Sequence, residues 1–596
     1  MINKKPLIII GLILVIGFGG FFAKNQMAKA EYNKLIETGL DHMDKEEYSQ
    51  ALRVFDQAND TYEKSNLASV YRAQVYFKLN HYPNTVAYAL KAINLDADSH
   101  REEMNLLLTE VYLLQKKPNL AFARAKSVPK GTLIRHFNQM DISSYDADQV
   151  EDLINLHYHF TSEEQTMTFV EDLIETYPDM ASLHHFKGVL FHNRGDYYHA
   201  IEHAQAAVSL DNQARYYSSL MAAYYSSHRM YACQDLAHEV LDNHYNLDEA
   251  KYFLALTHKF MGEYDQALDY ALDLKKGNPN SILTGYFTKD DLTALLGELY
   301  LRLGDEEEAN GYFESYKDQG SHVDQLVKDL KKQTVGEAAE NDASYLADLI
   351  KTHYMFDYDL KPSHGIKGKL SDQDIDTLLQ AMKDPEDPFT YVLYGDYYNY
   401  YVDNNPHYLY KQLADDVHYI NFEIFTQTVH LDFIRDLDTI ENSQEATLIL
   451  DLRDNMGGQL IGTQHILDNL IDQGLLFTLV SERDYDEDFE ANDFKKDFKA
   501  IYVLVNEGTG SASELTALSL KENLDNVTLV GQTTYGKGVG QDIIDDIINQ
   551  RRYFIVNFYM MVGDINYHKT GVEPDILIDN DKIDTYMKDL LGLDDF

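Results

Sequence analysis

A repeating spacing of small residues in the first half of the chain constrains the fold most strongly. Ala200, Cys233 and Ala267 each follow a tyrosine closely and recur at intervals of about 34 residues. Ala309 follows after a longer interval. Small residues at a fixed spacing let paired helices approach closely, and such helix pairs bury their apolar faces only by stacking on neighbours. The pattern predicts an all-α helical-repeat solenoid of about six or seven helix pairs over residues 31–325, with a less regular part near residues 133–178.

Glycines mark the expected turns between paired helices. Gly195, Gly262 and Gly304 each precede an acidic residue, at positions where glycine can take a left-handed conformation at low cost. In the N-terminal part, Ala51 and Ala87 occupy the small-residue position. These segments resemble tetratricopeptide repeats, which implies a surface that binds a protein or a peptide. A plain spacer or a dimerisation surface is the alternative.

The charge of the chain limits its partners. Asp and Glu number 98 against 51 Lys and Arg, which leaves a formal net charge of -47. Phosphate binding needs clustered cations, so we expect no nucleic-acid partner. Cys233 is the one cysteine, which excludes an intrachain disulfide and a cysteine-rich zinc site.

Histidines cluster within the predicted repeats. Two of them are one helical turn apart, a spacing that can bind zinc. No carboxylate or water site accompanies them in the sequence, which favours packing or solvent-exposed histidines, and we predict no metal. The cluster comprises His184, His185, His192, His199 and His203, of which the last two form the pair.

The N-terminal segment predicts export. Residues 6–23 carry no charge and lie between Lys4-Lys5 and Lys24, a length at the short end for a membrane-spanning helix. Lysines ahead of such a segment predict that its N-terminus stays inside while the rest is exported. We therefore expect a signal anchor over residues 1–30, a single pass through the cell membrane, and the bulk of the chain on the extracytoplasmic side. Cleavage at residues 28–30, Ala-Lys-Ala, would instead give a secreted protein.

The pattern changes after the repeats. Residues 326–343 are rich in lysine, glutamate and alanine, which indicates a linker. Strands then alternate with helices, which predicts an α/β domain over residues 344–596 with a mixed, largely parallel sheet. The chain is thus expected to be multidomain. Expected strands are 417–425, 446–453, 475–480, 501–505, 527–530 and 552–562, and expected helices are 431–440, 460–471 and 511–524.

Glycine-rich loops follow three of these strands, where ligand sites form in open α/β sheets. Ser511 lies in one of them and opens a helix, so its hydroxyl would lie near the positive end of the helix dipole. With Glu514 it also forms a capping box, and a serine that only caps the helix is the competing interpretation. Lys537 lies in another glycine-flanked loop, where it has no evident structural use. A desolvated lysine with a lowered pKa can deprotonate a serine.

One rival motif overlaps this region. The run from Gly531 to Lys537 has the spacing of a phosphate-binding P-loop. Gly538 stands where a serine or threonine would hold magnesium, and strands follow where a helix is required. Nucleotide binding is therefore not favoured.

Four motifs in order resemble the catalytic core of the C-terminal-processing, or tail-specific, serine proteases. They span residues 448–458, 502–514, 529–541 and 568–575. The resemblance implies a Ser-Lys dyad in which Ser511 is the nucleophile, Lys537 is the general base and Gln541 supports the lysine. It implies no metal and no organic cofactor.

The same resemblance implies an oxyanion hole formed by backbone amides. These are the N–H of Ala512 and one from the glycine pair, with Gly458 favoured over Gly457. Three features depart from the family. Met456 replaces the usual proline, and the interval from Ser511 to Lys537 is about one residue longer than usual. The interval from Thr390 to Tyr419 is too short for the family's PDZ domain.

We therefore expect an exported, membrane-anchored serine endopeptidase that cleaves protein substrates through an acyl-enzyme. The repeat array would recruit a protein substrate or partner in place of the PDZ domain. A catalytically inactive protein-binding scaffold built from the same domains is the alternative, and a domain that binds peptide C-termini without cutting them is a third hypothesis.

Overall fold

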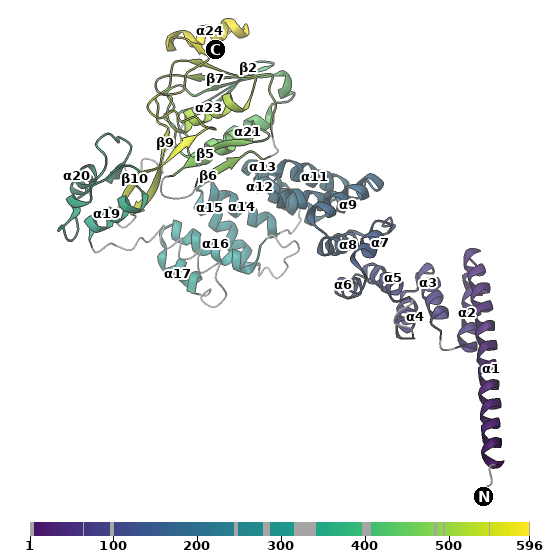
Figure 1. Cartoon of the computed structure of the whole chain (residues 1–596). Coiled ribbons are helices and arrows are strands. Elements are labelled where there is room, and N and C mark those ends of the chain that lie inside the picture. The colour runs from purple at the N-terminus through teal and green to yellow at the C-terminus, as the bar shows by residue number, and fades with distance from the viewer. Residues whose placement is uncertain are drawn as a thin grey trace. The chain divides into compact units, whose positions relative to one another are not determined.

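A computed structural model describes most of the chain as two compact units, residues 1–190 and 191–596 (Figure 1). The described residues are 5–62, 65–95, 100–243, 248–277, 287–314, 341–395, 407–481, 486–492, 495–546, 549–594 and 596, with side chains from Lys24 onward except Glu306. The predicted anchor at residues 6–23 lies in the backbone of α1 (Lys5–Asp44), but its side chains fall outside this description. Within the described part, no helix combines the length and the apolar content needed to cross a bilayer.

The first unit is entirely helical in its described residues. Its helices follow one another through short turns, as the repeat pattern predicts. They are α1, α2 (Tyr48–Thr61), α3 (Leu67–Lys78), α4 (Tyr82–Leu95), α5 (Arg101–Leu114), α6 (Pro118–Ala125), α7 (Lys130–Phe137), α8 (Ala147–Phe160), α9 (Glu163–Thr176) and the first part of α10 (Ala181–Asn193).

The second unit begins with the remaining helical repeats. Ala200, Cys233, Ala267 and Ala309 are all buried, as expected for small residues at helix–helix contacts. The helices are α11 (Tyr197–Leu210), α12 (Ala214–Ser226), α13 (Met230–Asp242), α14 (Asp248–Phe260), α15 (Tyr264–Lys276), α16 (Lys289–Arg302) and α17 (Glu306–Glu314). The solenoid fold predicted from the spacing is therefore confirmed.

The turns of the repeats have the conformation that the sequence predicts, but one residue that was expected to be buried is exposed. Gly195, Gly262 and Gly304 have φ angles of 81°, 79° and 83°, in the left-handed region that glycine tolerates. The prediction for Ala87 was wrong, because this residue is exposed and Thr85 is buried. Helix α4 buries Thr85, Ala89 and Ala92, one stripe at helical spacing that leaves Ala87 on the opposite side.

A six-stranded sheet forms the centre of the α/β domain. Its order is β11-β8-β7-β4-β3-β2, and all neighbours are parallel except β2 and β3. Strand β4 reads Thr-Leu-Ile-Leu-Asp and is buried at all five positions, as a central parallel strand requires. The strands are β2 (Tyr408–Ala414), β3 (Val417–Phe422), β4 (Thr447–Asp451), β7 (Ala500–Val505), β8 (Val527–Gly531) and β11 (Ile576–Leu577).

Helices cover both faces of this sheet. Leu448 and Leu450 of β4 belong to the core formed with α21 (Val429–Thr439), α22 (Leu460–Asp468) and α23 (Ala512–Asn523). Ile449 points to the other face and packs with Ile583 and Met587 of α24 (Ile583–Leu591). This three-layer arrangement holds the carboxyl ends of β4, β7 and β8 together at one edge.

A second, antiparallel sheet was not predicted. It has the order β1-β10-β5-β6, with β9 paired to β10. Helices α19 (Asp342–His353) and α20 (Asp372–Met382) pack on it (Figure 1). Its strands are β1 (Tyr391–Tyr394), β5 (Leu475–Val480), β6 (Glu487–Glu490), β9 (Val539–Asp546) and β10 (Arg551–Met561).

The predicted linker at residues 326–343 falls largely on residues 315–340, which lie outside the described part. Where the description resumes, Asn341 caps α19 by accepting hydrogen bonds from the backbone of Ala343 and Ser344.

Candidate active site

The three glycine-rich loops of the sequence meet at the carboxyl edge of the parallel sheet. They follow β4, β7 and β8 and carry Gly457, Ser511 and Lys537 respectively. Backbone bonds join them, because Gly510 N–H donates to Asn455 O at 2.9 Å and Tyr535 N–H donates to Thr509 O at 2.9 Å. Loops that are distant in the sequence are thereby fixed against one another.

A buried carboxylate, Glu514, connects the Ser511 loop to the Lys537 loop. Its Oε2 accepts the backbone N–H of Ser511 at 2.7 Å and that of Lys537 at 2.9 Å. Its Oε1 accepts the Gly536 N–H at 2.6 Å and the Thr534 hydroxyl at 2.5 Å. Burial raises the pKa of the Glu514 carboxyl, and these four hydrogen bonds oppose that shift.

Ser511 has a backbone conformation that non-glycine residues rarely adopt. Its φ is 54° and its ψ is -119°, immediately before α23. Such a conformation costs about 1–3 kcal/mol and persists only where surrounding contacts enforce it. Two such contacts are the Glu514 bond and the hydroxyl of buried Tyr567, which donates to Ser511 O at 3.2 Å. A sharp strand-to-helix turn of this kind presents a nucleophilic serine in other hydrolases.

Lys537 is partly buried beside Gln541. Its Nζ donates to Gln541 Oε1 at 2.9 Å, and Gln541 Nε2 donates to Phe389 O at 2.8 Å. The Lys537 Nζ also lies 5.1 Å from the centre of the Phe389 ring. Burial lowers the pKa of Lys537 to about 8, against the opposing charges of Asp387 and Glu514. A substantial fraction of this amine is therefore neutral and able to accept a proton slightly above neutral pH.

The glycine pair lies directly against the serine. A Cβ on Gly457 would lie 2.7 Å from Ser511 Cβ and from Ala512 N, so only glycine fits there. The Gly457 N–H donates to Asn455 Oδ1 at 3.0 Å. In contrast, neither the Gly458 N–H nor the Ala512 N–H has an acceptor within the described residues. Two such donors are what a negatively charged oxygen needs.

Several residues of this arrangement carried no distinct signal in the sequence. The sequence predicts for Glu514 only a role in the capping box of the helix. Asn455 is fully buried and donates from Nδ2 to Phe422 O at 2.7 Å, besides accepting from Gly457. Phe389 and Tyr567 act through contacts that span long stretches of chain, which local patterns do not reveal.

The histidines considered for zinc in the sequence do not converge. His199 Nδ1 lies 2.7 Å from Asp196 Oδ2, and the rings of His199 and His203 both stack on Phe191. Across the described residues, the one group with metal-ligand spacing is a different set, His228, His430 and His465.

Comparison with known proteins identifies the region that carries this geometry. Residues 416–578 match the sequence model of the family described as peptidase family S41. The chain contains a peptidase family S41 domain. The matched range includes Ser511, Lys537 and Gln541 but begins after Phe389, the residue that holds Gln541 in place.

Curated relatives are carboxyl-terminal-processing proteases. The S41 region is 30% identical over 166 residues to such a protease from Synechocystis sp. (strain ATCC 27184 / PCC 6803 / Kazusa), covering 28% of this chain and 39% of that protein. It is 29% identical over 170 residues to the carboxy-terminal processing protease CtpA of Bacillus subtilis (strain 168), covering 28% and 36% respectively. The chain thus spans less than half the length of these relatives.

A solved structure described as a lipoprotein from Streptococcus agalactiae is also similar. It is 18% identical with a TM-score of 0.36, covering 42% of this chain and 95% of that one. A score of this size does not define the fold, which the strand order and helices above establish directly.

Replacing Glu514 by Gln should destabilise the domain that contains the site. The amide keeps one oxygen and turns an NH2 group toward backbone donors, so at least one buried donor loses its acceptor. We expect the free energy of unfolding to fall by about 2–3 kcal/mol, measured by urea denaturation.

The matched control is Glu522→Gln, on the exposed side of the same helix. We expect this change to stay within about 0.5 kcal/mol of the wild type. Equal stability of the two variants would contradict the role of Glu514.

Proposed function

We propose that the chain is a serine endopeptidase that cleaves protein substrates with a Ser511-Lys537 dyad. The observation that carries this proposal is the strained turn at Ser511, which Glu514 joins to the backbone of Lys537, a partly buried lysine of lowered pKa. A lysine with a lowered pKa or a serine with a strained backbone can each occur for other reasons. Here one carboxylate holds both residues, which favours a shared catalytic role. The similarity to carboxyl-terminal-processing proteases supports the same reaction class.

In the proposed reaction these groups act in sequence. Neutral Lys537 accepts the proton of the Ser511 hydroxyl while Oγ attacks the carbonyl carbon of the scissile peptide bond. The N–H groups of Gly458 and Ala512 bind the oxygen that becomes negative. The Lys537 ammonium then protonates the leaving amine, which yields an acyl-enzyme. Water, deprotonated by Lys537, attacks the ester and restores the serine.

Two exposed apolar side chains suit a polypeptide substrate. Met456 is 73% exposed and Tyr535 is 57% exposed. Both belong to the loops that contact the Ser511 loop. We propose that they contact apolar substrate residues close to the cleaved bond. Such contacts would help to hold the substrate in a chain whose interval between β1 and β2 is too short for a PDZ domain.

The helical repeats are proposed to recruit the substrate or a protein partner. Their packed helix pairs present side chains in series, and repeat surfaces of this type bind extended partners. The strongly acidic composition supports a protein partner over a nucleic acid.

Ser511→Ala and Lys537→Ala should each abolish cleavage of an unstructured protein without unfolding the chain. The first change removes the nucleophile and the second removes the base, so we expect rates to fall by about 10³-fold or more. Cleavage can be followed by gel electrophoresis or by release of a fluorescent fragment.

Lys499→Ala, at an exposed lysine of the same domain, is the matched control and should cleave at the wild-type rate. If the wild-type chain cuts no faster than either dyad variant, the domain is an inactive binding scaffold.

We further propose that residues 1–30 anchor the chain in the cell membrane with its bulk outside the cytoplasm. The support is the uncharged run at residues 6–23 behind Lys4 and Lys5. The chain should stay in the membrane fraction after an alkaline wash, and sequencing of its mature N-terminus should begin ahead of residue 6. A mature N-terminus after Ala30, with the protein in the medium, would contradict the anchor.

A further inference from the structure

Three histidines from distant parts of the second unit converge away from the S41 catalytic groups. His228 lies in the turn between α12 and α13, His430 in α21 and His465 in α22. One ring nitrogen of each lies within 4.8 Å of the others. His228 Nδ1 is 3.0 Å from His430 Nε2, and the ring centres of His228 and His465 are 3.6 Å apart. The group therefore joins the helical repeats to the α/β domain.

This spacing matches the ligand requirements of zinc. Tetrahedral Zn²⁺ binds imidazole nitrogen at about 2.0–2.1 Å, which sets its ligand nitrogens roughly 3.3 Å apart. His228 Nδ1 and His430 Nε2, at 3.0 Å, are close to that separation, and His465 would have to turn its ring away from that of His228 to complete the set. Three imidazoles without a carboxylate are a donor set that favours zinc over magnesium or calcium.

Hydrogen bonding among the histidines leaves part of the group unsatisfied. One N–H can bridge His228 and His430, yet His430 Nδ1 is buried and has no partner within the described residues. Zinc bound at His430 Nε2 would not contact Nδ1, so the proposed ion rests on the spacing of the three ring nitrogens. Burial lowers the pKa of all three imidazoles, and the neutral form is the one that binds metals.

The backbone turn of the repeat positions His228 against α21 and α22. His228 has a φ of 57°, in the turn position that Gly195 holds one repeat earlier and Gly262 one repeat later. A histidine in this left-handed conformation costs more than a glycine. Glu46, Asn80 and Lys116 have the same left-handed φ in earlier turns, so this conformation positions His228 without marking a metal site by itself.

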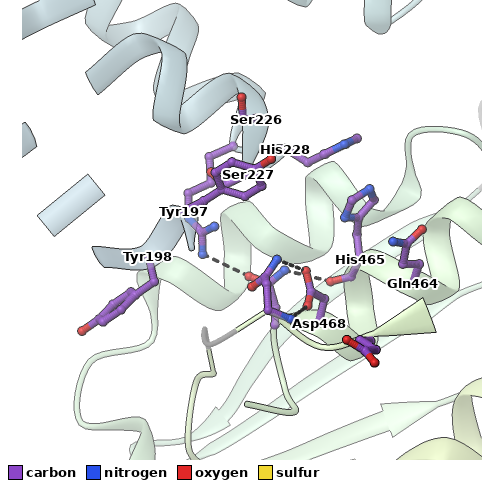
Figure 2. Close-up of a pocket in the computed structure, with 12 residues that line it drawn as sticks. Tyr197, Tyr198, Ser226, Ser227, His228, Gln464, His465 and Asp468 are labelled. Atoms are coloured by element: carbon purple, nitrogen blue, oxygen red, sulfur yellow. Dashed lines mark hydrogen bonds between the residues drawn. The ribbon is translucent and has the colours of Figure 1, made fainter. Parts of the chain in front are cut away.

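A cavity borders the group on one side. Its volume is about 270 Å³, and it is lined by His228, His465, Asp468 and Asn492 among others. Figure 2 shows the rings of His228 and His465 beside one another at its edge. The cavity is large enough to admit an ion with water, and neither Ser511 nor Lys537 lines it.

Polar contacts next to the histidines hold the same two regions together. Arg229 donates to Asp438 at 3.0 Å and to Asn469 at 3.0 Å. The Tyr231 hydroxyl donates to Asp432 at 3.1 Å. The histidine group is therefore the central part of a preformed contact, where a bound ion would add directly to its stability.

We propose that His228, His430 and His465 bind one Zn²⁺ ion, with water from the adjoining cavity as the fourth ligand. The ion fastens the last helical repeats to the S41 domain. This site has a structural role, and its occupancy does not depend on whether the domain cleaves peptides.

The test is zinc binding by the full chain after metal is stripped with a chelator. Competition against a chromophoric zinc chelator should give one site per chain, and Co²⁺ in its place should give the intense visible absorption of tetrahedral cobalt. Zinc should also raise the melting temperature of the wild type.

Two ligand variants are chosen to preserve the fold. His228→Asn keeps a residue that tolerates the left-handed turn, as Asn80 does in an earlier turn, and His465→Gln changes a half-buried side chain. Each should weaken zinc affinity by about 100-fold or more and lose the zinc-dependent rise in melting temperature. The double variant His199→Gln/His203→Gln is the matched control and should bind zinc as the wild type does.

Circular dichroism of the metal-free variants confirms that they fold. No zinc bound by the wild type, or wild-type affinity in both His228→Asn and His465→Gln, would overturn the proposal. In that case the three rings only stack and share a hydrogen bond.

Discussion

The candidate site depends on one buried carboxylate. Glu514 is fully buried and accepts four hydrogen bonds, from the backbone of Ser511, Gly536 and Lys537 and from the Thr534 hydroxyl. A carboxylate that lost water without such donors would be strongly destabilising. Because the donors come from two loops, satisfying the charge requires both loops to adopt one arrangement. The strained backbone of Ser511 and the backbone position of Lys537 are therefore set by the same constraint.

The antiparallel sheet positions the side chain of Lys537. Gln541 lies in β9 of the antiparallel sheet, and it links Lys537 Nζ to the carbonyl oxygen of Phe389. The lysine is thereby held between a parallel sheet that supplies the glycine loops and an antiparallel sheet that supplies its amide partner. Burial between them lowers its pKa to about 8, which suits a proton acceptor near neutral pH.

The sequence predicted those features that depend on local spacing. The buried positions of Ala200, Cys233 and Ala267 followed from the repeat period, and the left-handed turns at Gly195 and Gly262 followed from the glycines. Ala87 was misplaced because the exact start of α4 decides which residues face inward, and a degenerate repeat does not fix that start. The positions of β3, β4, β5, β7, β8 and β10 were also predicted, whereas those of β1, β2, β6 and β11 were not. The division of the strands into two sheets depends on pairings between distant segments.

The site was predictable only in part for the same reason. Ser511 and Lys537 could be nominated from their glycine-rich loops and from a family resemblance. The role of Glu514 could not, since Ser511 and Glu514 on a helix end also describe an ordinary cap. His228 and His430 are about 200 residues apart in sequence, so no local pattern could bring them together, and the histidine pair that did attract attention packs on Phe191.

Covalent labelling of Ser511 by a fluorophosphonate probe, followed by peptide mass spectrometry across a range of pH, tests the central claim most directly. A probe of this type reacts with an activated serine and needs no knowledge of the substrate. If Lys537 is the base, the probe attaches to Ser511, and the labelling rate rises with pH through a midpoint near 8, where the amine becomes neutral. In Lys537→Ala the labelling should disappear. Absence of label on Ser511, or a rate unchanged in Lys537→Ala, would contradict the account.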